Sequence, residues 1–150
     1  MKISVIGTGY VGLVTGVALS HIGHHVTCID IDEAKVEKMR QGISPIYEPG
    51  LEELMKENIQ AGRLFFTTSH QEGFKDVDVI YIAVGTPEKE DGSANLEYIE
   101  QAVRDIAANI TKDVIVVTKS TVPVGTNHYI KELLISLTPK HINVEVVSNP

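Results

Sequence analysis

The segment that most constrains this chain is its opening, where an apolar run leads directly into a glycine-rich turn. Residues 2–6 are mainly apolar, and residues 7–12 read Gly-Thr-Gly-Tyr-Val-Gly. A second apolar run, residues 25–29, ends at Asp30, 18 positions after Gly12. This order predicts a strand, a tight turn, a helix and a second strand that ends in an acid. The pattern is typical of a dinucleotide site, although a glycine turn without a ligand is the alternative.

Each part of this pattern has its own physical reason. Gly7 permits a tight turn, Gly9 lets the backbone approach a pyrophosphate, and Gly12 lets the helix pack closely on the strand. The helix begins at this turn, so its unpaired N–H groups and positive dipole end face the phosphates. Asp30 can accept hydrogen bonds from ribose hydroxyls and would repel a 2′-phosphate, which favours NAD over NADP. The alternative for Asp30 is a solvated carboxylate at a strand end.

The rest of the chain alternates between strand and helix patterns. Asp32 and Asn95 are good candidates for helix N-caps. An alternating pattern implies right-handed crossovers, and so an α/β fold: a Rossmann-type, doubly wound, parallel six-stranded sheet with helices on both faces, in the strand order 3-2-1-4-5-6. Strands are predicted at 2–6, 25–29, 64–67, 77–83, 114–118 and 143–147, and helices at 10–22, 32–42, 51–61, 71–75, from 95 to 110 and around 130–137.

Ligands of such a sheet lie at the carboxyl ends of its strands, so the segments that follow the strands are the candidate site. The fourth strand is followed by Gly85, Thr86 and Pro87, where glycine allows close approach and threonine offers a hydroxyl. An ordinary turn is the alternative. The fifth strand leads to two hydroxyls, Ser120 and Thr121, which could instead cap a helix. The sixth strand leads to residues 149–150.

Composition excludes several classes of function. The length of 150 residues suits one domain, 1–150, with one buried interior. The net charge is −7 and no basic cluster is present, which disfavours nucleic acid. No apolar run approaches the roughly 20 residues that span a bilayer. The single cysteine, Cys28, lies mid-strand as a small core residue, and its isolation suits a cytoplasmic location. No metal site is expected, because no cysteine or carboxylate cluster accompanies the histidines.

Taken together, the motifs resemble the N-terminal, NAD-binding domain of the UDP-glucose 6-dehydrogenase family. The resemblance covers the whole chain in the family's order. Relatives that act on GDP-mannose or UDP-N-acetylmannosamine share much of this pattern and stay open. Two other classes also stay open, a nucleotide-sensing module and a hydroxyacid dehydrogenase of the 3-hydroxyisobutyrate type. The matching stretches are Gly-Tyr-Val-Gly-Leu at 9–13, Asp-Ile-Asp at 30–32 with Lys35, Ser-Pro-Ile-Tyr-Glu-Pro-Gly-Leu at 44–51, Val-Gly-Thr-Pro at 84–87, Lys-Ser-Thr-Val-Pro-Val-Gly at 119–125 and Ser-Asn-Pro at 148–150.

The resemblance implies a reaction and roles for particular residues. Members of the family oxidise the C6 alcohol of UDP-glucose to a carboxylate, reduce two NAD⁺ and pass through a cysteine thioester. Asp30 and Lys35 would bind the adenosine ribose, although Lys35 could be a solvated helix lysine. Thr121 would help to organise the catalytic water. By the same resemblance, the pyrophosphate is held by Gly7, Gly9, Tyr10, Val11 and Gly12, the rest of the cofactor is flanked by Gly85, Thr86, Pro87, Ser120 and Thr121, and the substrate loop begins at Asn149 and Pro150.

The chain departs from the family in what it lacks. The family's catalytic lysine, asparagine, cysteine and aspartate lie further on, together with the UDP-sugar domain and the central helix through which the enzymes form homodimers. Cys28 lies in the wrong strand to be the nucleophile. The resemblance therefore implies an excised or truncated domain that binds NAD without turnover, with UDP-glucose held mainly by the absent C-terminal domain.

Overall fold

Six parallel strands form one sheet in the order β3-β2-β1-β4-β5-β6, as the sequence predicts. The computed structural model describes residues 1–120 and 122–149. The first and second strands pair in full register from Lys2 with His25 to Ile6 with Ile29. The strands are β1 Lys2–Ile6, β2 His25–Ile29, β3 Leu64–Thr67, β4 Val79–Ile82, β5 Val114–Thr118 and β6 Val144–Ser148, and the helices are α1 Tyr10–His21, α2 Glu33–Arg40, α3 Leu51–Gln60, α4 His70–Gly73, α5 Glu97–Asn109 and α6 Thr126–Leu137.

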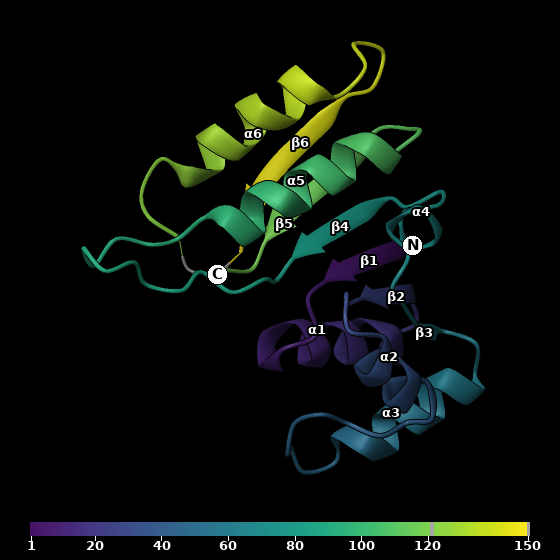
Figure 1. Ribbon diagram of the computed structural model, residues 1–150. Coiled ribbons are helices and arrows are strands. Elements are labelled where there is room, and N and C mark those ends of the chain that lie inside the picture. The colour runs from purple at the N-terminus through teal and green to yellow at the C-terminus, as the bar shows by residue number, and fades with distance from the viewer. Residues whose placement is uncertain (121, 150) are drawn as a thin grey trace.

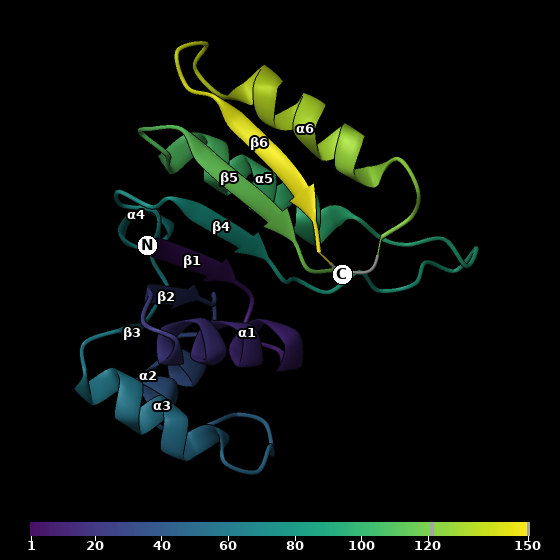
Figure 2. The same ribbon diagram turned by 180° about the vertical axis from the view of Figure 1, so that it is seen from behind.

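The sheet separates two hydrophobic cores. Successive side chains of a strand point to opposite faces. In β1, Ile3 and Val5 pack with the apolar faces of α1, α2 and α3. Ile6 faces the other way and packs with Phe74 and the apolar stripe of α5. Figures 1 and 2 show α5 and α6 together on one side of β4, β5 and β6, with α1, α2 and α3 gathered beside the first three strands.

The fourth strand is shorter than the predicted 77–83 because its start is tied down by polar contacts. Val77 is buried but lies before the strand. The Asp78 carboxylate accepts a hydrogen bond from the backbone N–H of Lys2 at 2.9 Å and from the Lys112 Nζ at 2.9 Å. These contacts lower the pKa of Asp78. The first two residues of the predicted run therefore lead into β4 and fix its entry beside β1.

Helix ends follow local hydrogen bonding. Asp32 caps α2, since its Oδ1 accepts from the Lys35 backbone N–H at 3.1 Å, as predicted. The predicted cap of α5 is wrong by one position, because Leu96 occupies the N-cap and carries no acceptor. Asn95 still accepts a hydrogen bond from the Glu97 N–H at 2.9 Å. The short predicted helix at 71–75 is observed as α4, one position earlier at its start.

Helix α1 lies unusually close to β2 because Gly16 has no side chain. A Cβ at Gly16 would lie 2.5 Å from the Sγ of Cys28. Cys28 is fully buried, which confirms it as a core residue, and burial raises the pKa of its thiol to about 12. Over residues 1–120 and 122–149, no helix has the length and apolar character that a membrane crossing requires.

Candidate dinucleotide-binding site

A cleft of about 330 Å³ opens at the carboxyl ends of β1, β2 and β4. Its floor comes from residues 6–9 after β1, residues 29–31 after β2 and residues 83–85 after β4. One wall is formed by side chains of α4 and α5. This is the point where the strand order reverses between β1 and β4, so the cleft lies where ligands of doubly wound sheets bind.

Two of the three fingerprint glycines are required by the fold itself. Gly7 adopts a φ of +100°, and a Cβ there would lie 2.7 Å from the Ala83 carbonyl oxygen. Its N–H donates to the Ile29 carbonyl at 2.9 Å, which holds the turn beside β2. A Cβ at Gly12 would lie 2.0 Å from the Gly7 carbonyl oxygen. Both positions therefore keep α1 against the first turn, as the sequence predicts.

The third fingerprint glycine is not required by the fold. Gly9 adopts ordinary extended backbone angles, φ −70° and ψ −169°. Apart from Gly9 itself and its two neighbours in the chain, no atom of the described residues lies within 4 Å of the position that a Cβ would take. The protein leaves this space open directly at the N-terminus of α1. A ligand that must approach the backbone closely explains the absence of a side chain there.

The N-terminus of α1 is also prepared for an anion. Among the described residues, no side chain caps this helix end, and its first turn holds no acidic residue. By contrast, Asp32 caps α2, and Glu52 and Glu53 lie in the first turn of α3. Unpaired N–H groups and the positive end of the helix dipole therefore face the cleft, as a pyrophosphate requires.

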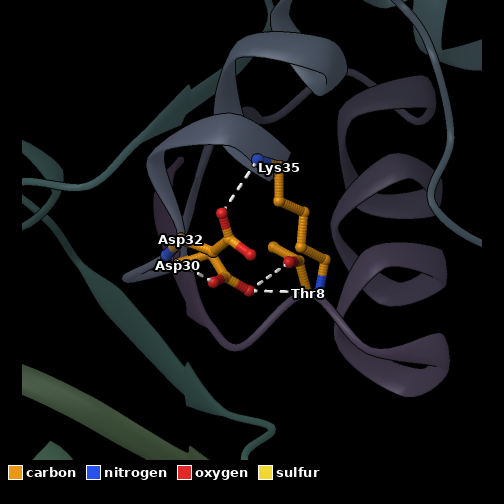
Figure 3. Close-up of polar contacts among 4 residues, drawn as sticks. All are labelled: Thr8, Asp30, Asp32 and Lys35. Atoms are coloured by element: carbon orange, nitrogen blue, oxygen red, sulfur yellow. Dashed lines mark hydrogen bonds and ion pairs between the residues drawn. The ribbon is translucent and has the colours of Figure 1, made fainter.

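Asp30 is fixed by three partners at the end of β2 (Figure 3). The Thr8 hydroxyl donates to its Oδ2, the Asp32 backbone N–H donates to its Oδ1 at 3.0 Å, and the Lys35 Nζ lies 3.3 Å from Oδ2. Burial raises the pKa of Asp30, but these hydrogen bonds and the lysine charge outweigh it, so the pKa is lowered overall. The carboxylate is ionised at neutral pH and stands as an oriented acceptor for hydroxyl groups.

Lys35 and Thr8 gain roles from this geometry. Lys35 is not a free helix lysine, since it reaches across the first turn of α2 to Asp30. Thr8 occupies a variable position of the fingerprint and was not singled out by the motif. It is almost fully buried, and its hydroxyl links the glycine turn to Asp30. The only sequence signal for it is a hydroxyl residue between the first two glycines of the fingerprint.

The loops after β4 and β5 are joined to each other. Ser120 donates its hydroxyl to the Val84 carbonyl at 2.7 Å, so it holds the two loops together. Apart from its two neighbours in the chain, no atom of the described residues lies within 4 Å of a Cβ position at Gly85, which leaves the same kind of open space as at Gly9. Thr86 is half-buried beside it, and Pro87 is exposed. Of these residues, Gly85 lines the cleft, and Ser120 is joined to the cleft residue Val84 by its hydrogen bond.

Two exposed apolar side chains, Tyr10 and Val11, flank the start of α1. The Glu48 charge and a hydrogen bond to that carboxylate raise the pKa of Tyr10. Glu48 belongs to the loop before α3, so this contact places the Tyr-Glu-Pro-Gly segment beside the N-terminus of α1.

The profile of the UDP-glucose/GDP-mannose dehydrogenase family, NAD binding domain, matches residues 1–150. The chain belongs to this family. The open space at Gly9, the uncapped α1 and the Asp30 carboxylate fit the NAD that this family's domain binds. The sequence-based assignment of both fold and family is thereby confirmed.

Known members of the UDP-glucose/GDP-mannose dehydrogenase family resemble the chain along its whole length. UDP-glucose 6-dehydrogenase YwqF of Bacillus subtilis is 60% identical over 150 residues, which are 100% of this chain and 34% of that protein. GDP-mannose dehydrogenase of Pseudomonas aeruginosa gives a TM-score of 0.94 at 40% identity, over 100% of this chain and 36% of that one. UDP-D-ManNAc dehydrogenase of Pyrococcus horikoshii gives 0.92 at 30% identity, over 100% and 36%. The chain thus spans about a third of the length of these relatives.

Among the predicted site residues that the structure describes, Asn149 does not line this cleft. Thr121 and Pro150 lie outside the described residues. Asn149 is exposed, and its backbone N–H donates to the Thr118 carbonyl at 2.9 Å. The cleft also holds the side chains of His70 and Asp105, which are in contact. No local motif predicted this pair, because the two residues come from different helices and meet only in the folded chain.

Proposed function

We propose that this chain is the cofactor domain of a UDP-glucose 6-dehydrogenase, which oxidises UDP-glucose to UDP-glucuronate with two NAD⁺ in the whole protein. The 60% identity to YwqF along the entire chain carries this proposal. The fold matches a GDP-mannose dehydrogenase and a UDP-ManNAc dehydrogenase about equally well, so the fold alone does not select the sugar.

The residues of the cleft divide the work of holding NAD. Gly9 and the N-terminus of α1 would receive the pyrophosphate, and Asp30 with Lys35 would bind the adenosine ribose. Gly85 and Thr86 would border the other half of the cofactor. Bound NAD⁺ supplies the hydride acceptor for the sugar alcohol. The lining of the cleft by Gly9, Asp30 and Gly85 supports these roles, as does the 3.3 Å contact of the Lys35 Nζ with Asp30; Thr86 is included because it directly follows Gly85.

The isolated domain is expected to bind NAD without turnover. A thioester mechanism needs an accessible thiolate, and the single cysteine of the chain, Cys28, is fully buried with a raised pKa. The substrate contacts, the nucleophile and the dimer interface would come from the part of the relatives that this chain does not match. A homodimeric whole enzyme and a cytoplasmic location belong to the same proposal.

The first test is a calorimetric titration of the chain with NAD⁺ and, in parallel, with NADP⁺. We expect saturable NAD⁺ binding and binding of NADP⁺ that is weaker by about tenfold or more, because Asp30 would face the 2′-phosphate. The matched variant is Gly9→Ala. Its backbone angles suit alanine, and its Cβ would contact no atom beyond its neighbours in the chain. Alanine is a poorer N-cap than glycine, so the melting temperature should fall by about 2–4 °C at most, whereas NAD⁺ affinity should fall clearly. Equal affinity of the variant and the natural chain would contradict the assigned phosphate site.

The sugar is tested in the whole protein. NADH formation should depend on UDP-glucose, with GDP-mannose and UDP-N-acetylmannosamine as the competing substrates. A higher rate with either of the other sugars would replace the UDP-glucose assignment and leave the cofactor assignment intact.

A further inference from the structure

The cleft continues past Asp30 into a polar cluster that the roles above do not use. The Nε2 of His70, at the start of α4, lies 3.4 Å from the Oδ2 of Asp105 on α5. The Nε2 of Gln101, one turn earlier on α5, donates to the Oδ1 of Asp105 at 3.2 Å. All three side chains line the same cleft as the glycine turn. The Asp105 carboxylate is therefore held from two sides and stays partly exposed to the cleft.

The cluster lies on the adenosine side of the cleft. Helix α4 packs against both β2 and α5, so His70 lies on the side of the strand that ends at Asp30. Tyr98 lies near the start of α5, and Asp105 lies two turns, about 10 Å, further along the same helix. With the pyrophosphate at Gly9 and the ribose at Asp30, the next group of the cofactor is the base. The part of the cleft that remains for it is the part lined by α4 and α5.

The walls of this part suit a flat ring. Ile31, directly after Asp30, is 83% exposed, Tyr98 is 58% exposed, and both line the cleft. Ala102, which also lines the cleft, is buried and contributes only a methyl group. A base bound here can cover the exposed apolar surface of the two large side chains.

We propose that Asp105, held by His70 and Gln101, accepts a hydrogen bond from the exocyclic amine of adenine and makes the site selective for that base. This inference rests on the proposed NAD site. An ionised carboxylate only accepts hydrogen bonds, and each of its oxygens can take a further donor beside the one it already has. Adenine presents an amine, a donor, at its position 6. Hypoxanthine presents a carbonyl oxygen there, and two acceptors repel each other.

The test compares NAD⁺ with nicotinamide hypoxanthine dinucleotide, in which a carbonyl oxygen replaces the amine at position 6 and the neighbouring N1 carries a hydrogen. Binding is followed by the backbone amide resonances of Gly7, Gly9 and Gly12, since these report phosphate binding whatever the base. The natural chain should bind NAD⁺ about tenfold or more tightly than the hypoxanthine analogue. In Asp105→Ala and in the isosteric Asp105→Asn, NAD⁺ should lose affinity while the analogue does not, so that the preference shrinks to about twofold or less.

Glu100→Ala is the matched control. Glu100 lies on the same helix and also takes part in charged contacts, but it accepts from the Tyr129 hydroxyl outside the cleft. This variant should keep the preference of the natural chain. Equal binding of the two dinucleotides by the natural chain, or an equal loss for both in the Asp105 variants, would overturn the proposal and leave His70–Asp105 as a brace between α4 and α5. Glycine amides that respond to neither dinucleotide would overturn the cofactor site itself.

Discussion

Helix α1 packs closely on β2 at Gly16 and Cys28. Substituting both residues by alanine, singly and together, tests this packing most sharply. A Cβ at Gly16 would lie 2.5 Å from the Cys28 Sγ, whereas ordinary contacts begin near 3.4 Å. The next atoms, on Val26 and Val5, would lie at 3.7 Å and present no conflict. The clash of a Gly16→Ala variant is therefore with a single atom.

The magnitudes follow from that geometry. Forcing an extra methyl group into a filled interior costs about 1–3 kcal/mol. Replacing glycine by alanine inside a helix returns about 1 kcal/mol, so Gly16→Ala should lower the free energy of unfolding by about 1 kcal/mol. Cys28→Ala removes the Sγ and leaves a small void, which costs about 1 kcal/mol. In the double variant the new methyl group takes the place of the sulfur, and both losses should largely disappear.

The free energy of unfolding is measured by urea titration followed by circular dichroism, for the natural chain, the two single variants and the double variant. The double variant should lie within about 0.5 kcal/mol of the natural chain, whereas additive effects would place it about 2 kcal/mol below. Gly12→Ala combined with Cys28→Ala is the control, because the Gly12 clash is with a carbonyl oxygen that the cysteine variant does not remove. Additive losses for the Gly16 pair would refute the packing of α1 on β2.

Three further predictions concern other contacts. Asp30→Asn should weaken NAD⁺ binding by about tenfold and narrow the preference over NADP⁺, because the repelling charge is lost; parallel calorimetric titrations measure both. The Cys28 thiol should resist a disulfide reagent in the folded chain and react on unfolding. Since its pKa is raised from 9.0 to about 12, its burial stabilises the fold below pH 9.0, and thermal melts should show this stability being lost as pH rises from 9.0 toward 12. Asn58→Ala should cost about 1–3 kcal/mol in urea unfolding, because the buried Asn58 Oδ1 accepts from the Arg63 Nε at 3.1 Å and Nη2 at 2.8 Å; Arg63→Lys, which loses the paired geometry, should cost less than that.

The order of the strands was within reach of the sequence because it depends on local patterns. Apolar runs, glycines and the alternation of strand with helix can be recognised in short segments. The right-handedness of the crossovers then restricts the order of the strands. The error at β4 arose where a contact distant in sequence overrides the pattern. The Asp78 carboxylate accepts hydrogen bonds from Lys2 and Lys112, and the sequence around residue 78 does not indicate either contact.

The site divides in the same way. The glycines and Asp30 could be read from spacing, since a motif fixes them relative to one another. Thr8 was missed because its hydroxyl acts only when β1 and β2 lie side by side. The pair His70–Asp105 joins residues 35 positions apart in sequence, on two helices. Contacts of that kind exist only after folding, which is why the base end of the cleft could not be predicted when its phosphate end could.

The central position of β1 has a consequence for how the chain folds during synthesis. Of the buried side chains that the structure describes in the core under α1, α2 and α3, only Val79 and Val117 come from beyond residue 67. The first half of the sheet can therefore close on one side as soon as β3 has left the ribosome, since domains form from the N-terminus as they are made. Until β4 arrives, the second edge of β1 is an open template. A slow second half would leave that edge exposed to strands of other nascent chains.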